Sequence, residues 1–339
     1  MKRIVFITQQ VDPDHPALAA TIPQIRALAD RVDEVVVLAD TALRASLPDN
    51  CRIRTFRAPA QVARGLRFVA ALAPELARRP LAILAHMCPI YAILAAPLAR
   101  PVGVPVLLWF THWRARPKLA VAERLATRVL TVDETSFPLR SRKVTPIGHA
   151  VDTGRFSCVE TRAAETLRLV ALGRFAPSKR YELLFRSVEL ARESGLDVAL
   201  DVYGPVLTAE ERDYRAGLRP PPGVELHDGV AGSSVPQLLR RYDALVSATR
   251  AGSADKAVLE AAASCIPVVA SSAPVEGVLR FTTAEDLAAR LRELAALDSP
   301  ARARLGRAAR DEVVRRHSVD VWAERVLAAA RAGAADNRG

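Results

Sequence analysis

The sequence predicts an α/β protein with parallel sheets, on the strength of three observations. Half of the 339 residues are hydrophobic but only 5% are aromatic, so the core must consist mostly of Ala, Leu and Val. Short runs typical of buried strands alternate with helical runs in both halves of the chain. A break rich in Pro, Gly and Asp, at 143–156, separates the halves. This alternation is typical of parallel sheets covered on both faces, so we expect two Rossmann-like domains.

Apolar runs and helical periodicity place the elements of the first half. We expect strands at 3–8, 34–39, 81–86, 104–110 and 128–133, and helices at 16–31, 62–79 and 117–127. The helix at 62–79 has an apolar face formed by Val62, Leu66, Val69 and Leu76. We expect this face to pack in the core, while the arginines beside it leave a membrane surface as the alternative.

One apolar run, residues 81–99, is long enough to cross a bilayer. Pro89 and Pro97 divide it, however, and His86 interrupts it. We therefore expect a buried strand, a turn and a short buried helix. The apolar run at the N-terminus, "RIVFIT", is too short for a signal peptide, so the sequence favours a cytoplasmic protein.

The second half repeats the alternation of strands and helices. Strands are expected at 167–173, 197–204, 224–229, 243–248 and 266–271. Helices are expected near 180–194, 207–217, 234–241 and 254–264, with a last amphipathic helix at 319–332. Open parallel sheets bind ligands beyond the carboxyl ends of their strands, so we expect functional residues in the loops that follow the strands.

The charge balance predicts anionic partners. The chain has 48 Lys and Arg against 37 Asp and Glu, a net charge of +11. Such a field attracts phosphorylated ligands, anionic lipid headgroups or nucleic acid. The basic residues are spread over many helices, and no zinc finger, helix-turn-helix or aromatic RNA-binding signature is visible, so we expect no nucleic-acid partner.

The four cysteines predict buried thiols. Cys51, Cys88, Cys158 and Cys265 form no CxxC pair, and each lies in or beside an apolar run. This pattern fits a reducing cytosol and argues against a disulfide framework or a zinc site.

The loop "GRFAPSKR", 173–180, has the features of an anion site. Gly173 allows a tight exit from the preceding strand, and Pro177 can begin a helix. Lys179 and Arg180 would then lie in its first turn, where the helix dipole disfavours cations. A bound anion would reverse that penalty. The alternative is a pair of solvated surface cations.

The segment "AGSADKAVLEAAASCIPVVAS", 251–271, predicts a second loop of the same kind. We expect Gly252 and Ser253 to open a crossover helix whose first amides face a ligand. The alternative is structural, because Lys256 and Glu260 can form an i,i+4 ion pair worth about 0.2–0.5 kcal/mol.

Three segments in order, "GRFAPSKRYELLFRSV", "DVYGP" and "GSADKAVLEAAASCIPVVAS", resemble family 4 of the retaining glycosyltransferases. "IGHAVDTGRF" resembles the stretch that joins the two domains in that family, and "LLWFTHWRARPKLAVAERLATRVLTVDETSF" resembles its acceptor-side region. The resemblance implies a GT-B fold, in which two Rossmann-like domains face each other across a cleft. It implies an acceptor-binding domain at 1–148, a nucleotide-sugar-binding domain at 149–316 and a C-terminal helix, 317–339, that returns toward the first domain.

The resemblance also implies roles for single residues. Arg174 and Lys179 match the pair that grips the diphosphate of a nucleotide-sugar, and His112 matches the histidine that approaches the transferred sugar. Glu260 matches the glutamate that binds the ribose hydroxyls. The family usually has another glutamate eight positions earlier, where this chain has Gly252. The implied donor-binding set is Gly173, Gly252, Ser253, Ala254, Asp255, Lys256 and Glu260.

The implied reaction is transfer with retention from a nucleotide-diphosphate-sugar, with UDP or GDP as the expected nucleotide. The acceptor would be a sugar, a lipid-linked molecule or a small molecule, with Gln9, His86 and Trp113 expected on the acceptor side. We expect no cofactor and no metal, since two cations would replace the metal. "DPDH" at 12–15 could be mistaken for a metal-binding motif, but Asp-Pro turns and a helix N-cap explain it better.

Two other functions and one location stay open. A Rossmann-type oxidoreductase is disfavoured, because no GxGxxG follows the first strand. A non-catalytic nucleotide-sugar-binding protein stays open because of Gly252. The segment 109–118 combines Trp109 and Trp113, whose rings can stack on sugars, with Arg114, Arg116 and Lys118, whose charges suit either a phosphate or an anionic membrane surface. Peripheral contact with the inner face of a membrane therefore stays open.

Overall fold

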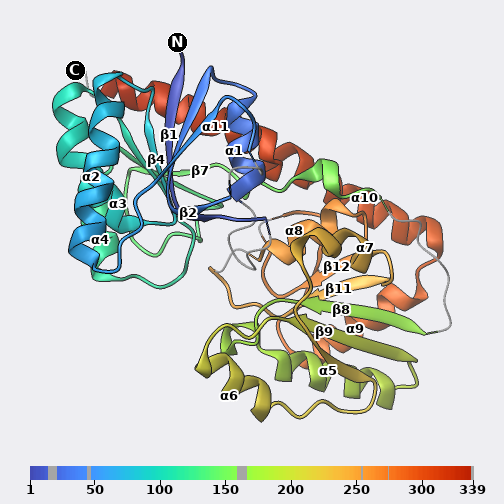
Figure 1. Ribbon diagram of the computed structural model, residues 1–339. Helices are drawn as coiled ribbons and strands as arrows, with labels where there is room; N and C mark the ends of the chain where they lie inside the picture. Colours follow the sequence, from blue (N-terminus) through green and yellow to red (C-terminus); the bar gives the residue numbers. More distant parts are fainter. Residues whose placement is uncertain (14–20, 44–46, 159–165, 253–254, 274, 337–339) are drawn as a thin grey trace. The chain divides into compact units, whose positions relative to one another are not determined.

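The computed structural model describes residues 1–13, 21–43, 47–158, 166–252, 255–273 and 275–336 (Figure 1). The chain forms two compact units, Met1–Ala150 with Ser318–Gly339, and Val151–His317. Each unit is built on one parallel sheet with helices beside it. The expectation of two Rossmann-like α/β domains is therefore confirmed.

The first unit contains a seven-stranded parallel sheet with the order β3-β2-β1-β4-β5-β6-β7. Its strands are β1 (Arg3–Val11), β2 (Glu34–Ala42), β3 (Cys51–Thr55), β4 (Ile83–His86), β5 (Val106–Trp109), β6 (Arg128–Thr131) and β7 (Val144–Pro146). The chain runs outward from β1 to β3 and then returns to β4 on the other side of β1. The carboxyl ends of β1 and β4 are therefore the switch point of this sheet.

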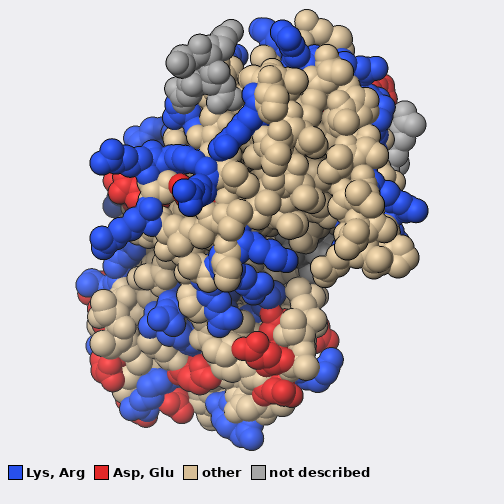
Figure 2. Space-filling model, turned by 90° about the vertical axis from the view of Figure 1, so that its left-hand side faces the viewer, with Lys and Arg blue, Asp and Glu red and all other residues tan. Residues whose placement is uncertain are grey.

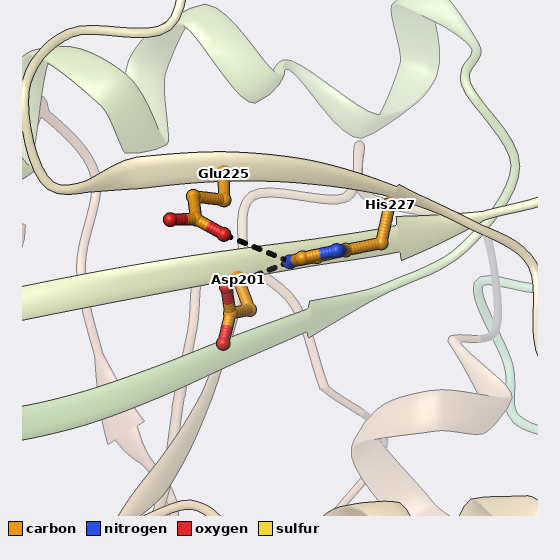
Figure 3. Close-up of side chains that lie close together, drawn as sticks. All are labelled: Asp201, Glu225 and His227. Atoms are coloured by element: carbon orange, nitrogen blue, oxygen red, sulfur yellow. Dashed lines mark hydrogen bonds and ion pairs between the residues drawn. The ribbon is translucent and has the colours of Figure 1, made fainter.

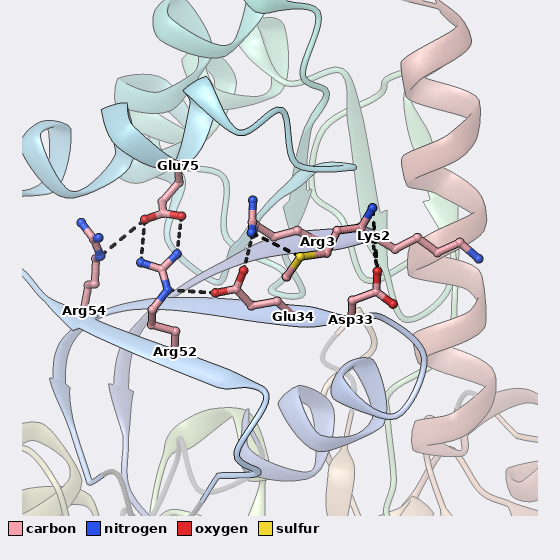
Figure 4. Close-up of polar contacts among 8 residues, drawn as sticks. Lys2, Arg3, Asp33, Glu34, Arg52, Arg54 and Glu75 are labelled. Atoms are coloured by element: carbon pink, nitrogen blue, oxygen red, sulfur yellow. Dashed lines mark hydrogen bonds and ion pairs between the residues drawn. The ribbon is translucent and has the colours of Figure 1, made fainter.

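The strand β3, whose alternate residues are charged, was not expected from the sequence. Arg52 of β3 donates to both carboxylate oxygens of Glu75, at 3.0 and 2.6 Å, and to Glu34 of β2, at 2.9 Å (Figure 4). Arg54 lies 3.4 Å from Glu75, which is fully buried on α2 (Gln61–Ala77). A buried carboxylate needs such partners. No local pattern signals this strand, because its ion partners are distant in sequence.

Two groups of helices cover the sheet of the first unit (Figure 1). On one face, α2 packs with α3 (Pro89–Ala99), and α3 packs with α4 (Pro117–Leu125). On the other face, α1 (Thr21–Ala29) packs with α11 (Val319–Asp336). Trp322 of α11 is fully buried, edge-on to Trp109 of β5 with ring centroids 5.8 Å apart. The C-terminal helix is thus part of the first unit.

The apolar face expected for α2 is wrong in its first two turns. Val62 is 77% exposed and Leu66 is 67% exposed. The buried stripe is instead Phe68, Leu72 and Leu76, spaced four residues apart. Phe68 determines the rotation of the helix, because its ring packs against the aromatic rings of the core behind it.

The apolar run at 81–99 forms β4 and α3, as expected. α3 begins at Pro89, where a missing N–H costs nothing, and it contains Pro97. None of the helices in the described part of the chain is both long and apolar enough to cross a bilayer.

The second unit contains a six-stranded parallel sheet with the order β10-β9-β8-β11-β12-β13. Its strands are β8 (Leu167–Leu172), β9 (Val198–Gly204), β10 (Val224–Asp228), β11 (Ala244–Ser247), β12 (Val268–Ala270) and β13 (Leu279–Arg280). Its helices are α5 (Tyr181–Glu193), α6 (Ala209–Gly217), α7 (Val235–Leu239), α8 (Lys256–Ala263), α9 (Ala284–Ala296) and α10 (Ser299–His317). Four elements of the two units, β7, β13, α9 and α10, were not expected from the sequence.

The prediction of four thiols is wrong for one pair of cysteines. Cys158 and Cys265 form a disulfide, with Cα atoms 4.7 Å apart across 107 residues of sequence. Cys51 and Cys88 are buried thiols, as expected. Burial raises the pKa of Cys51 to about 11 and that of Cys88 to about 12. Spacing along the chain could not reveal the disulfide, because only the fold brings its two cysteines together.

Candidate functional site

The switch point of the second unit lies between β8 and β11. The chain passes from β8 outward to β10 and then returns to β11 beside β8. The loops after these two strands, 173–180 and 248–255, therefore start side by side. They are joined directly, since the N–H of Arg250 donates to the carbonyl oxygen of Ser178 at 2.9 Å.

The absence of a side chain at Gly173 allows Lys179 to pack against the backbone that follows β8. Its φ angle is +150°, which favours glycine. A Cβ atom at this position would lie 2.7 Å from the Nζ atom of Lys179. Gly204 of the neighbouring strand β9 is also needed here, because a Cβ atom at this position would collide with the carbonyl oxygen of Gly173. The two glycines thus make room for the backbone and for a cation.

Lys179 is held by a buried carboxylate. Its Nζ atom lies 3.0 and 3.1 Å from the two carboxylate oxygens of Asp255, which is only 4% exposed. Ser247 and Thr249 also donate to Asp255, at 2.6 and 2.5 Å. Burial by itself would raise the pKa of Asp255, but the charge of Lys179 and these hydrogen bonds outweigh it and lower that pKa. Asp255 is therefore ionised and fixes the Lys179 ammonium between the two loops.

Both helices expected to begin in these loops begin later. α5 starts at Tyr181, after a 3-10 turn at Pro177–Lys179, so Lys179 and Arg180 precede the helix and do not lie in its first turn. α8 starts at Lys256, and the side chain of Asp255 caps it by accepting from the N–H of Ala257 at 3.3 Å. A helix starts where a cap satisfies its first amides.

Arg180 has a structural role that the sequence analysis missed. Its backbone is left-handed, with φ +49°. Its guanidinium donates to the carbonyl oxygen of Ala248 at 2.7 Å and to the hydroxyl of Ser271 at 2.9 Å. Arg180 thus ties the loop after β8 to the ends of β11 and β12.

Arg174 forms an ion pair that the sequence did not predict. Its guanidinium lies 2.7 Å from Glu211 of α6, and Glu211 is nearly buried while Arg174 is about half exposed. Glu211 also accepts from the N–H of Leu207 at 2.7 Å. The guanidinium keeps other N–H groups for a ligand, since arginine has five.

The remaining donor-side residues lie around α8. Gly252 has φ +80°, a conformation suited to glycine, at the position where family 4 usually has a glutamate. Lys256 and Glu260 form the i,i+4 ion pair that was the structural alternative, and the Glu260 side chain is only 13% exposed. Ser253 and Ala254 lie outside the described residues, as do Asp14 and His15 of the "DPDH" stretch.

A pocket of about 320 Å³ lies at the carboxyl ends of β1, β4 and β5 in the first unit. Its lining residues are Gln9, Met87, Cys88, Pro89, Ile90, Phe110, His112, Arg114, Arg116, Lys118 and Leu119. His112 is fixed here, because its N–H donates to the carbonyl oxygen of Ser136 at 3.0 Å and its Nδ1 atom accepts from the N–H of Arg114 at 2.9 Å. The proton of a neutral His112 ring is therefore on Nε2. The structure brings two expected residues, Gln9 and His112, into one pocket.

His86 and Trp113, also expected on the acceptor side, do not line this pocket in the described part of the chain. His86 is 6% exposed and stacks on Phe6, with ring centroids 5.4 Å apart. Burial, with a smaller contribution from His149, lowers the pKa of His86 to about 3, so the ring is neutral. Trp113 stacks on His112 and lies under the guanidinium of Arg114.

One cluster of side chains has the composition of a metal site. Asp201, Glu225 and His227 offer ligand atoms within 4.8 Å of one another on the neighbouring strands β9 and β10 (Figure 3). The Nε2 atom of His227 lies 2.8 Å from Asp201, whose other oxygen accepts from Tyr242 at 2.6 Å. These groups thus satisfy one another. Nothing in the sequence indicated a partner for His227, because strand pairing supplies it.

The second unit is a Rossmann-like domain, and its Lys179 and Arg174 lie in the loop that follows β8 at the switch point of the sheet. Residues 166–296 of this unit match the family model described as glycosyl transferases group 1. No curated protein sequence matches the chain significantly.

Solved structures similar to the chain share its whole two-domain architecture. HepE of Anabaena, solved in complex with UDP-glucose, is 17% identical with a TM-score of 0.73, and the match covers 97% of this chain and 98% of HepE. Sucrose-phosphate synthase of Thermosynechococcus elongatus is 16% identical with a TM-score of 0.74, covering 99% of this chain and 100% of the synthase. The chain therefore has the GT-B fold, and part of its second unit matches a glycosyltransferase family model.

Proposed function

We propose that the protein transfers a sugar from a nucleotide-diphosphate-sugar to an acceptor, with retention of the anomeric configuration and without a metal ion. The observation that carries the proposal is the Lys179–Asp255 pair at the switch point of the unit that matches the glycosyltransferase model. That HepE was solved with UDP-glucose and also with UDP supports a uridine nucleotide as the donor. The resemblance to family 4 supports retention.

In this proposal Lys179 and Arg174 stabilise the diphosphate as it leaves. An ammonium group has three N–H donors, and Asp255 accepts from at most two of them, so one remains for a phosphate oxygen. Arg174 is half exposed and offers further N–H groups. Two fixed cations can thus balance the charge that a metal ion would balance in other enzymes.

Glu260 and the loop at 252–256 have the remaining donor roles. Glu260 would accept hydrogen bonds from the ribose hydroxyls, while Lys256 holds its carboxylate in place. Gly252 replaces the glutamate of the family, so backbone groups of this loop would contact the sugar. His112, with its proton on Nε2, would donate to a hydroxyl of the transferred sugar.

An assay with UDP-, GDP- and dTDP-sugars tests the proposal. We expect turnover of at least one donor in the presence of EDTA, and a product whose anomeric configuration, read by NMR, matches that of the donor. Lys179→Ala should lower kcat by about 10²–10³. Because this change also leaves the buried Asp255 without its counter-charge, kcat is measured at a temperature at which circular dichroism shows the variant to be folded. Binding of a nucleotide-sugar with no hydrolysis or transfer by any acceptor tested would contradict the enzymatic role.

We also propose that the protein works in the cytoplasm with peripheral contact to an anionic membrane. The Cys158–Cys265 disulfide removes the cysteine pattern from the support for this location, which rests on the short apolar run at the N-terminus. The exposed Val62 and Leu66 on α2, together with the basic residues of the first unit, support this contact.

A further inference from the structure

The pocket of the first unit is surrounded by cations. Arg114, Arg116 and Lys118 line it, and all three are exposed. In the part of the chain that the structure describes, none of them forms an ion pair with a carboxylate. Basic side chains also outnumber acidic ones over the upper part of the face drawn in Figure 2. Three uncompensated cations at one pocket attract an anion.

Two helices begin at the same pocket. Pro89 and Ile90 of the first turn of α3 line it, and so do Lys118 and Leu119 of the first turn of α4. Neither first turn contains an acidic residue. The positive end of the α4 dipole disfavours Lys118, and a bound anion would offset this effect. Both helices begin with a proline, and the N–H groups of Tyr91 and Leu119 already donate within their own turns, so the helix ends contribute mainly through their dipoles.

The backbone is also unusual at this pocket. Met87, directly after β4, has a left-handed conformation with φ +57°. Its Sδ atom accepts from the N–H of Thr111 at 3.4 Å, which ties the loop after β4 to the loop after β5. A bulky residue adopts this conformation only where the surroundings impose it, and such positions cluster at ligand sites.

We propose that this pocket binds a phosphoryl group of the acceptor. A phosphate monoester carries nearly two negative charges and three acceptor oxygens, which match three cations, whereas a carboxylate has one charge and two oxygens. Gln9 and His112 line the same pocket and supply polar groups for neighbouring hydroxyls. That the bound molecule is the acceptor rests on the proposed function. The pocket then selects a polyol or sugar that carries a phosphate monoester, either as a free molecule or as part of a phospholipid headgroup.

Calorimetry with glycerol phosphate and with glycerol tests the site. Saturating UDP is added so that the nucleotide site proposed at the loops 173–180 and 248–255 is occupied. We expect glycerol phosphate to bind and glycerol not to bind. Arg116→Gln should weaken binding about fivefold, as for an exposed ion pair. The triple variant Arg114→Gln/Arg116→Gln/Lys118→Gln should weaken it on the order of 100-fold if the effects add.

Arg124→Gln is the matched control, because Arg124 lies in the last turn of α4, outside the pocket, and its loss removes the same charge. We expect this variant to bind glycerol phosphate like the wild type. Equal binding by the wild type and the triple variant, or equal loss in the triple variant and the control, would overturn the proposal.

Vesicles identify the source of the phosphoryl group. If it belongs to a headgroup, vesicles that contain phosphatidylinositol phosphate, whose headgroup carries a phosphate monoester, should sediment the wild type but not the triple variant, and glycerol phosphate should compete. If it belongs to a free molecule, the triple variant should lose glycerol phosphate binding and keep its vesicle binding. UDP binding is measured separately, so a wild type that binds glycerol phosphate but not UDP would contradict the proposed function and leave the phosphoryl site standing.

Discussion

At the scale of residues, Asp255 is the side chain that holds the loops 173–180 and 248–255 together. It receives hydrogen bonds from Lys179, Ser247 and Thr249 and caps α8 through the N–H of Ala257. A neutral amide at this position would leave a largely buried ammonium without its counter-charge. Asp255 therefore does not take the place of the glutamate that family 4 usually has at position 252, because Asp255 is buried and faces Lys179.

Asp255→Asn should lower the free energy of unfolding by about 2–4 kcal/mol and weaken UDP binding, because it unpairs Lys179. Chemical denaturation and UDP titration measure the two effects. The lowered pKa of Asp255 means that its contribution is present above about pH 4, its unfolded pKa, and is lost as the pH falls through the folded value. The variant should therefore lose less stability than the wild type in this acidic range. An unchanged acid dependence would contradict the assignment.

A second effect of pH on stability is expected from His86, which is a base buried in its neutral form, whereas Asp255 is an acid buried in its charged form. Its pKa is about 3 in the folded protein and about 6.5 when unfolded, so the unfolded state binds the extra proton between these values. Stability of the first unit should fall as the pH drops from about 6.5 toward 3, by up to about 1.4 kcal/mol per pH unit from this group. His86→Gln should remove that part of the slope in denaturation curves measured from pH 7 to pH 4. A variant with the wild-type slope would show that other groups cause it.

At the scale of elements, the pattern of apolar residues determined neither where α8 begins nor which face of α2 is buried. A capping side chain determined the first, and a large aromatic side chain determined the second. The pattern located α8 to within a few residues, but the Asp255 cap determined its first residue. In α2 we expected the stripe that begins with Val62 and Leu66 to be buried. The stripe that begins with Phe68 is buried instead, because an aromatic ring removes more apolar surface from water than Val62 or Leu66 does.

Substitutions in α2 separate these two stripes. Val62→Ser/Leu66→Ser should change the free energy of unfolding by less than about 0.5 kcal/mol, since both side chains are exposed. The same variant should bind less to phosphatidylglycerol vesicles if this face contacts a membrane. Leu72→Ala, within the buried stripe, should cost about 2–5 kcal/mol. Equal destabilisation by both changes would show that the exposed stripe is packed in solution.

At the scale of the whole molecule, the last helix completes the first unit although 167 residues of the second unit, Val151–His317, precede it. The sequence predicted that this helix is amphipathic, but it did not predict that the helix packs against α1 and the sheet of the first unit. Trp322 meets Trp109 in the core, and Arg31 of the segment after α1 donates to Asp320 at 2.9 Å.

Trp322→Ala should destabilise the first unit by about 3–5 kcal/mol, because it opens a large cavity in the core. UDP binding, proposed for the second unit, should change little. Thermal unfolding and UDP titration test this, with Arg331→Ala, exposed on the same helix, as the control. Loss of UDP binding in the Trp322 variant at a temperature where it stays folded would contradict this division of roles.

The sequence by itself determined the alternation of elements, the two parallel sheets and the loops in which the candidate residues lie, because periodicity and apolar runs are local properties. Only the tertiary structure decided the partners: Asp255 for Lys179, Glu211 for Arg174, Cys158 for Cys265, and the strand β3 held by its distant carboxylates. These contacts join residues that lie 37 to 107 positions apart, or in the case of β3 on separate elements. Their geometry follows from strand order, which no single stretch of sequence encodes.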